Sequence, residues 1–414
     1  MDPIPLSLPF LMDGATGTEL QKRGMPLGAC TEQWALEHPE ALLELQRAYV
    51  EAGARVLVTP TLGANRGALE KFGLAGRVEE YNVRLAGLTR QAAAGHALVA
   101  GDLGPTLHAI PPYGETPFEM LVGFYAEQAA ALERAGVDLF LVESVMAMAE
   151  ARAAVLGIRE SGSRRPILVT CYCDEEGRTP SGTDVLACAI VMQGMGVSAF
   201  GLNCVDPAVA EEQLARLHQY TDLPLIAEPS AGLPDLTSEK PVYPDNAGAF
   251  ARRTPQWAAA GVRIFGGCCG TTPAHIAAMG RAMAGVDFSA FPPVEKDPDV
   301  IPCASEKEAR FITPDVDVGE TIQCTDHLME DILEAEEERP VGALKIEVLD
   351  TDDLEIFAQE QYAVRDALCL WSDVPELLEG ALRAYQGRAF YDGTAELEPE
   401  FLARMSEKYG LILL

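Results

Sequence analysis

Three cysteines are the residues of this sequence best suited to chemistry. Cys268 and Cys269 are adjacent, with glycines on both sides, and Cys204 lies far earlier in the chain. Adjacent side chains on a regular strand point to opposite faces, so both thiols reach one metal ion only where the backbone bends, and glycine permits that bend. Paired, glycine-flanked cysteines are therefore a more specific signal than a single thiol.

The surrounding sequence places all three thiols where a strand ends and a helix begins. Residues 262–265 predict a short buried strand before the cysteine pair, and Thr272-Pro273 is typical of a helix start. Cys204 is the last residue of the predicted apolar strand 199–204, and Asp206-Pro207 then opens a helix. Three thiols at the carboxyl ends of two parallel strands make a zinc site with one open position, the arrangement of catalytic zinc rather than of closed structural sites.

Two other interpretations of these cysteines stay open at this point. Free cysteine is among the most buried residue types, so Cys204 taken alone is more often a core residue than a ligand. A disulfide between Cys268 and Cys269 is the second alternative. Its geometry is strained and the compartment looks reducing, so the sequence favours zinc.

The composition bounds the classes of function. The chain has 414 residues, enough for two domains or one large barrel with an appendage, and its formal charge is -32. Nucleic acid and anionic membrane surfaces are poor partners for so acidic a protein. The ten cysteines lack the spacing of a disulfide scaffold, the first ten residues do not resemble a secretory signal, and no uncharged run approaches the ~20 residues of a membrane span. We expect a cytoplasmic protein with no nucleic-acid or membrane partner.

From Leu8 to about Gly285, short apolar runs alternate with amphipathic segments of helical length, which is typical of repeated strand–helix units. Eight units over this length favour an α/β fold, the (β/α)8 TIM barrel, with its active site at the carboxyl ends of the strands. A doubly wound open sheet is the alternative. Nearly every expected strand ends on a polar or metal-binding residue, which favours an enzyme. These ends are Asp13, Thr59, Asp102, Glu143, Thr170, Cys204, Glu228 and Gly267.

The remainder of the chain predicts a second, smaller α/β segment. Residues 288–314 combine prolines with mixed charges, which is typical of a linker. We therefore expect a barrel over 1–287, a linker over 288–314 and a partial α/β domain over 315–414. Strands are expected in this last segment at residues 343–349, 367–371, 388–391 and 411–414.

Six motifs follow one another in the barrel region. They are Asp13-Gly14-Ala15-Thr16-Gly17-Thr18-Glu19, Glu37-His38-Pro39-Glu40, Gly101-Asp102-Leu103-Gly104-Pro105, Gly201-Leu202-Asn203-Cys204, Glu228-Pro229-Ser230-Ala231-Gly232 and the stretch from Gly266 to Pro273. In order and content they resemble the homocysteine S-methyltransferase family, in particular the homocysteine-binding barrel of cobalamin-dependent methionine synthase. The resemblance covers about residues 8–285.

The resemblance implies a zinc ion held by Cys204, Cys268 and Cys269, with the sulfur of homocysteine as a further ligand. It also implies a site for the amino-acid part of homocysteine, in which backbone N–H groups hold the carboxylate and acidic side chains hold the ammonium. These substrate contacts are the backbone of Gly14, Ala15 and Thr16, the side chains of Asp13 and Glu143, and Asn203. From charge alone, N–H groups in a turn suit an anion and two carboxylates suit a cation. Without the family, Asp13 is equally well a turn or cap residue.

The activity implied is that of a zinc-dependent homocysteine S-methyltransferase that makes methionine. Methylcobalamin on a corrinoid protein supplied in trans is the first expected methyl donor, because the closest motifs are those of the cobalamin-dependent enzyme. S-methylmethionine, a sulfonium compound, is the alternative donor. A different class of function is a non-catalytic zinc- or thiol-binding subunit of a methyltransferase complex.

Two features depart from methionine synthase. Ser230 stands where an asparagine able to fill the open zinc position is common, so water or another side chain has to fill it here. Residues 318–322 and 381–388 resemble, more weakly, the opening part of the pterin-binding barrel that follows in methionine synthase. The pterin-binding pattern is not preserved and only about half of that barrel is present, so folate binding is not expected.

Overall fold

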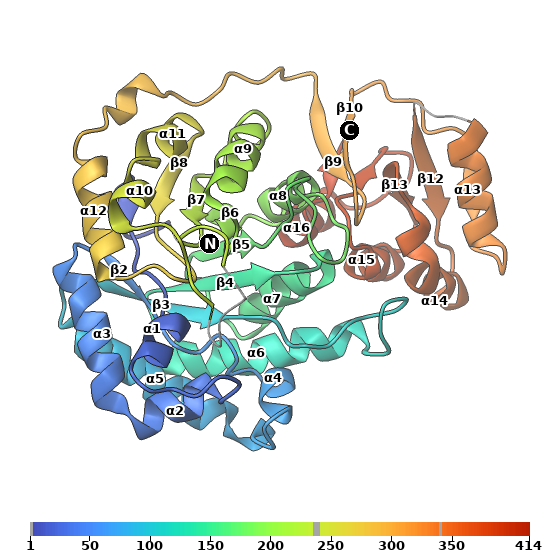
Figure 1. Cartoon of the computed structure of the whole chain (residues 1–414). Coiled ribbons are helices and arrows are strands. Elements are labelled where there is room, and N and C mark those ends of the chain that lie inside the picture. Colours follow the sequence, from blue (N-terminus) through green and yellow to red (C-terminus); the bar gives the residue numbers. More distant parts are fainter. Residues whose placement is uncertain (1–2, 235–240, 339–341) are drawn as a thin grey trace.

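The computed structural model describes residues 3–234, 241–338 and 342–414. It contains a barrel formed by the first part of the chain and a smaller unit formed by the last part, which lies beside the barrel (Figure 1). In these described ranges, no helix has both the length and the apolar character needed to cross a membrane.

The barrel is a sheet of eight parallel strands in the order β1-β8-β7-β6-β5-β4-β3-β2. Its ends meet, because β1 pairs with β8 and Met12, directly after β1, bridges to Val56 in β2. This closure confirms the TIM barrel and rules out the doubly wound open sheet. The strands are β1 (Phe10–Leu11), β2 (Val56–Val58), β3 (Leu98–Leu103), β4 (Leu139–Val145), β5 (Ile167–Cys171), β6 (Ala199–Asn203), β7 (Leu225–Glu228) and β8 (Val262–Phe265).

Helices cover the outside of the barrel (Figure 1). Alternate strand residues such as Leu141, Leu168 and Ile226 fill the barrel interior, while their neighbours pack outward against the helices. The helices are α1 (Gly17–Lys22), α2 (Thr31–Glu37), α3 (Pro39–Glu51), α4 (Arg66–Glu70), α5 (Val78–Ala93), α6 (Phe118–Arg134), α7 (Met148–Glu160), α8 (Val185–Gly194), α9 (Pro207–His218), α10 (Ala247–Ala251), α11 (Thr254–Ala259) and α12 (Pro273–Met283), with the short η1 (Ala75–Arg77).

The C-terminal unit is built on a five-stranded parallel sheet, in the order β11-β12-β13-β14-β15. The segment that we expected to be a linker contains an antiparallel hairpin, β9 with β10, whose buried residues pack against this sheet. The elements are η2 (Phe288–Ala290), β9 (Ile301–Ala304), β10 (Ala309–Ile312), β11 (Thr321–Gln323), α13 (Leu328–Glu338), β12 (Ala343–Glu347), α14 (Thr351–Glu360), η3 (Gln361–Ala363), β13 (Ala367–Trp371), α15 (Pro375–Ala384), β14 (Phe390–Tyr391), α16 (Pro399–Tyr409) and β15 (Ile412–Leu413).

Helix α7 of the barrel holds the C-terminal unit in place through two arginines. The fully buried Arg152 donates to the backbone oxygens of Leu382 (2.8 Å) and Arg383 (3.1 Å) at the end of α15. Arg159, two turns later, donates to the oxygens of two residues near the end of α16. The last carbonyls of a helix lack partners within the helix and carry partial negative charge, so a guanidinium is a fitting cap.

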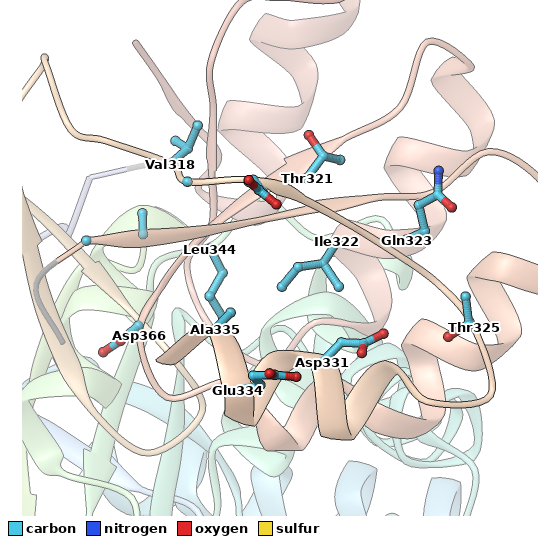
Figure 2. Close-up of a pocket in the computed structure, with 14 residues that line it drawn as sticks. Val318, Thr321, Ile322, Gln323, Thr325, Asp331, Glu334, Ala335, Leu344 and Asp366 are labelled. Carbon is cyan, nitrogen blue, oxygen red and sulfur yellow. The ribbon is translucent and has the colours of Figure 1, made fainter. Parts of the chain in front are cut away.

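The C-terminal unit also has an open cleft of about 470 Å³ between β11, β12 and α13 (Figure 2). Three acidic side chains along it, Glu320, Asp331 and Glu334, are exposed to solvent, and a fourth, Asp366, is paired with Arg310 (2.9 Å). At the carboxyl ends of the same sheet, the ammonium of Lys345 donates to Asp392 (2.6 Å). These two charged groups at that edge of the sheet are therefore paired with each other.

Candidate active site

A cavity of about 210 Å³ opens at the carboxyl ends of the barrel strands. Residues at or just after the carboxyl ends of seven of the eight strands line it, including Asp13 after β1, Asp102 in β3 and Glu228 in β7. All three cysteines singled out in the sequence line it as well. This is the end of the barrel at which TIM-barrel enzymes place their active sites.

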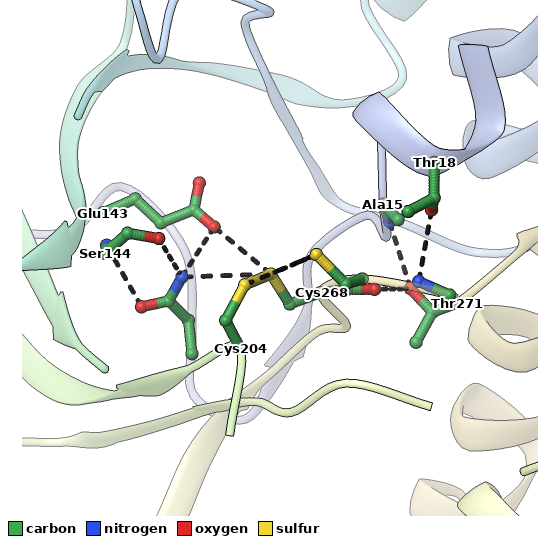
Figure 3. Close-up of a disulfide and its surroundings, with 10 residues drawn as sticks. Ala15, Thr18, Glu143, Ser144, Cys204, Cys268 and Thr271 are labelled. Atoms are coloured by element: carbon green, nitrogen blue, oxygen red, sulfur yellow. Dashed lines mark hydrogen bonds between the residues drawn. A yellow bond between two sulfur atoms is a disulfide. The ribbon is translucent and has the colours of Figure 1, made fainter. Parts of the chain in front are cut away.

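The three cysteine sulfurs lie together in this cavity. Figure 3 shows two of the residues, Cys204 and Cys268, beside Glu143 and Ser144. Cys204 and Cys268 form a disulfide, with sulfurs 2.23 Å apart. The sulfur of Cys269 lies 3.7 Å from that of Cys204 and 4.0 Å from that of Cys268. The disulfide therefore joins residues far apart in the sequence and is not the vicinal pair considered above. In the described part of the chain, these thiols are the group of potential ligands close enough to share one metal ion.

The arrangement of these thiols fits a zinc ion once the disulfide is reduced. Tetrahedral coordination with zinc–sulfur bonds of 2.3 Å places ligand sulfurs about 3.8 Å apart. Both separations that involve Cys269 are close to this value. A disulfide carries no thiolate, so Cys204 and Cys268 become ligands only in the reduced protein.

The backbone around the cavity is held in uncommon conformations. Cys204, directly after β6, has a φ of 57°, and Ser144, near the end of β4, has a φ of 60°. Few residues other than glycine adopt this left-handed region, and such conformations concentrate at functional sites. The Cys204 N–H is fixed by a hydrogen bond to the backbone oxygen of Glu228 (3.1 Å). The fold thus constrains the position of this thiol.

The buried carboxyl groups of Asp13, Asp102 and Glu228, with the half-buried one of Glu143, make the cavity acidic. Burial raises the pKa of each of these four groups. The neighbouring Glu143 carboxylate raises the pKa of Asp13, Asp102 and Glu228 further. Among the residues that the structure describes, one oxygen of Asp102 and one of Glu228 find no hydrogen-bond partner. A cation entering the cavity would relieve this repulsion, so the site suits an ammonium or another positively charged group.

The structure brings Asp13 and Glu143 to the cavity but places Asn203 behind it. Asp13 accepts a hydrogen bond from the N–H of Val58 (3.0 Å). The Asn203 side chain, which is fully buried, donates to Glu143 (2.9 Å) and to the hydroxyl of Ser144 (2.8 Å) and accepts from the Ser144 N–H (3.1 Å). Asn203 is therefore placed to orient Glu143.

The turn Gly14-Ala15-Thr16 lines the cavity, but its three N–H groups differ. The N–H of Ala15 is bonded to the hydroxyl of Thr271 (3.0 Å). In the described ranges, the N–H groups of Gly14 and Thr16 have no such acceptor. Two of the three remain available to an anion.

Sequence reasoning missed two residues that contribute to this site. Thr271 bonds to the turn and also donates to the backbone oxygen of Cys268 (2.7 Å). Its presence in the cysteine motif was the one signal that could have identified it. Glu32 lines the cavity from α2 and accepts from the N–H of Gly63 (2.7 Å). No motif marks it, since it lies on a helix between the first two strands.

Comparison with known proteins assigns the barrel, which carries this cavity, to a family. The sequence model of the family described as homocysteine S-methyltransferase matches residues 10–283, which is the barrel. This chain belongs to the homocysteine S-methyltransferase family. It is therefore a member of a family of methyltransferase enzymes.

Two curated relatives of this family member are methionine synthases of mycobacteria. The protein from Mycobacterium tuberculosis is 31% identical over 295 residues, which are 66% of this chain and 24% of that protein. The protein from Mycobacterium leprae is 30% identical over 302 residues, 69% of this chain and 25% of that protein. The chain thus spans about a quarter of the length of these relatives.

Among solved structures, the family member is similar to the homocysteine methyltransferase MmuM from Escherichia coli. The oxidized form of that enzyme has a TM-score of 0.56 at 28% identity, over 66% of this chain and 95% of MmuM. Its metallated form has a TM-score of 0.54 at 28% identity, over 65% and 94%. The similarity covers nearly the whole of MmuM, which supports the assignment of the barrel as the methyltransferase part.

Proposed function

We propose that this chain is a zinc-dependent homocysteine S-methyltransferase that makes methionine, with its methyl group supplied by a methylcorrinoid protein in trans. The observation that carries the proposal is the meeting of three cysteine sulfurs with an acidic, turn-lined cavity at the mouth of the barrel. The proposed compartment is the cytoplasm, where thiols stay reduced.

In this proposal Cys204, Cys268 and Cys269 hold the zinc after reduction. Bound zinc supplies one thing, which is a substrate thiol kept deprotonated, and therefore nucleophilic, at neutral pH. The carboxylates of Asp13 and Glu143 bind the ammonium of homocysteine, and the free N–H groups of the Gly14–Thr16 turn bind its carboxylate. These contacts orient the acceptor sulfur. It displaces the methyl group from its donor, the donor keeps the bonding electron pair, and the thiol proton passes to solvent.

The rim of the barrel supports a donor carried by another protein. Large apolar side chains are exposed on the loops that follow five different strands. They are Leu62, Leu107, Met146, Tyr172, Leu233 and Val242. Exposed apolar side chains on neighbouring loops, if they join into one patch, are typical of surfaces that bind another protein, and these six lie on loops at the mouth of the barrel. The docked corrinoid partner would present its methyl group to the cavity at the centre of this rim.

One observation favours a second candidate donor. The unpartnered oxygens of Asp102 and Glu228 make the cavity attractive to a cation. The sulfonium group of S-methylmethionine is a small cation of the kind that this cavity attracts. The second candidate function is therefore S-methylmethionine-dependent homocysteine methylation by the same cysteine site.

An assay with both donors tests the proposal. Reduced, zinc-loaded protein is incubated with homocysteine and either free methylcobalamin or S-methylmethionine, and methionine is quantified. We expect methionine from methylcobalamin. If methionine forms with S-methylmethionine but not with methylcobalamin, S-methylmethionine is the donor and the corrinoid protein is not. Zinc uptake with no turnover from either donor would contradict the proposed methyltransferase activity. It would favour a non-catalytic zinc-binding subunit.

The contacts of Asn203 predict a role in homocysteine binding. In Asn203→Leu, Glu143 loses a hydrogen bond and Ser144 loses two, while the side chain keeps a similar size. Loss of a residue that holds a binding side chain in place typically lowers affinity or activity about 10–100-fold. We therefore expect KM for homocysteine to rise about tenfold or more, with a smaller change in kcat. Steady-state kinetics measure this split. An unchanged KM would show that Glu143 needs no support from Asn203.

A further inference from the structure

One hydroxyl joins two parts of the site that lie far apart in the sequence. Thr271 accepts a hydrogen bond from the N–H of Ala15 (3.0 Å) and donates to the backbone oxygen of Cys268 (2.7 Å), as Figure 3 shows. A hydroxyl has one proton to donate, and the carbonyl of Cys268 can only accept it. The direction of both bonds is therefore fixed.

The sequence leaves space for this hydroxyl on both sides. A Cβ added to Gly14 would lie 2.8 Å from the Thr271 oxygen, and one added to Gly267 would lie 2.7 Å from the same atom. Real Cβ atoms do not approach so closely, so each glycine permits the threonine to sit between the turn and the cysteine loop. The Thr271 side chain is fully buried there.

Two further contacts hold the same turn. The hydroxyl of Tyr49 donates to the backbone oxygen of Ala15 (2.8 Å), and the hydroxyl of Thr18 accepts from the N–H of Gly270 (3.1 Å). Both backbone polar groups of Ala15 are therefore used inside the protein. This fixes the peptide planes on either side of Ala15, and with the second of them the free N–H of Thr16. The plane that carries the free N–H of Gly14 is held separately, because the oxygen of Asp13 accepts from the N–H of Gly267 (3.1 Å).

We propose that Thr271 is a positioning residue that sets the span between the turn that binds the substrate carboxylate and the cysteines that hold the metal. This inference rests on the proposed function. The carboxylate and the sulfur of homocysteine are the two ends of one small molecule, so both ends bind well only if the two segments keep one separation. A misplacement of about 1 Å can cost 100-fold in rate.

Thr271→Val tests the inference, because valine keeps the shape and removes the hydroxyl. The N–H of Ala15 then loses its acceptor, and the carbonyl of Cys268 loses the hydroxyl but keeps the backbone N–H of residue 271 as a donor (3.1 Å). We expect homocysteine to bind at least about tenfold more weakly to the reduced, zinc-loaded protein, and zinc affinity to fall about tenfold. Calorimetry measures the first and competition with a chromophoric chelator the second. Thr271→Ser, which keeps the hydroxyl, should stay within about threefold of the wild type.

Thr254→Val is the matched control. Thr254 is also fully buried in the barrel, at the start of α11, but its hydroxyl has no hydrogen-bond partner within residues 3–234, 241–338 and 342–414. If the wild type takes up neither zinc nor homocysteine, the proposed function fails, and the inference with it. If the wild type binds both and Thr271→Val behaves like Thr254→Val, only the inference is overturned.

Tyr49→Phe decides the matter if Thr271→Val does not fold. Tyr49 bonds to the turn at Ala15 but makes no hydrogen bond to the cysteine loop in the described structure. The inference predicts weaker homocysteine binding with unchanged zinc affinity in this variant. Unchanged homocysteine binding would overturn it.

Discussion

Replacing Cys204 by serine is expected to abolish zinc retention and methyl transfer together. Cys204 supplies one of three sulfurs within ligand distance of a single point, and in the described chain no histidine or carboxylate joins them closely enough to replace it. Residues that merely support metal ligands are worth 10–100-fold in affinity or activity, so loss of a ligand should exceed about 100-fold. Zinc content after gel filtration and methionine formation measure the two effects.

Cys173→Ala is the matched control for this prediction. Cys173 is also buried, just beyond the end of β5, but it is not part of the metal-binding group. It should retain zinc and activity. A second condition uses the wild type itself, because protein oxidised to the Cys204–Cys268 disulfide should take up no zinc until it is reduced. Full activity of Cys204→Ser would contradict the proposed zinc site.

The convergence of the three cysteines follows from the barrel. Eight strand–helix repeats predict a closed parallel sheet, and closure brings the carboxyl ends of distant strands to one mouth. Cys204 after β6 and the pair after β8 therefore come together around β7, although 64 residues separate Cys204 from Cys268. The same reasoning placed Asp13 and Glu143 at the rim, where the structure has them.

Side-chain contacts within the site did not follow from strand order. Asn203 is the last residue of β6 and was expected to contact substrate, whereas its amide faces Glu143 from behind. Two consecutive residues of a strand point to opposite sides, but the left-handed conformation of Cys204 breaks that rule. The role of Thr271 depends on a contact with a turn 256 residues away, which no local pattern encodes.

In the C-terminal unit, some strands could be predicted from the sequence and others could not. The strands expected at 343–349 and 367–371 were evident because these segments are apolar and regular, and the structure ends the first of them at Glu347. The hairpin of β9 and β10 was not, because Pro302 and charged residues around it are typical of a linker. A proline is tolerated in an edge strand, and Pro302 lies in a strand that pairs along its length with β10 and is bridged at Ala304 to Arg388. Packing of its buried residues on the neighbouring sheet adds to its stability.

Arg152→Ala is expected to produce the largest loss of stability among the changes considered. Arg152 is fully buried between the barrel and the C-terminal unit, where it donates to the oxygens of Leu382 and Arg383 and to the side chain of Gln386. Burial lowers its pKa to about 10, so it stays charged at neutral pH. Its removal leaves these acceptors without their cationic partner, and a buried acceptor left unpaired costs about 1–3 kcal/mol, so we expect a loss of about 3–5 kcal/mol.

Two comparisons separate the causes of this loss. Arg152→Met retains most of the volume but none of the donors, so it should recover only the packing part of the loss, because the carbonyls at the end of α15 remain unsatisfied. Arg164→Ala, at an exposed position just after α7, should stay within about 0.5 kcal/mol of the wild type. Urea denaturation followed by circular dichroism measures all three. If Arg152→Ala unfolds at the same midpoint as Arg164→Ala, the buried arginine is not what fastens the C-terminal unit to the barrel.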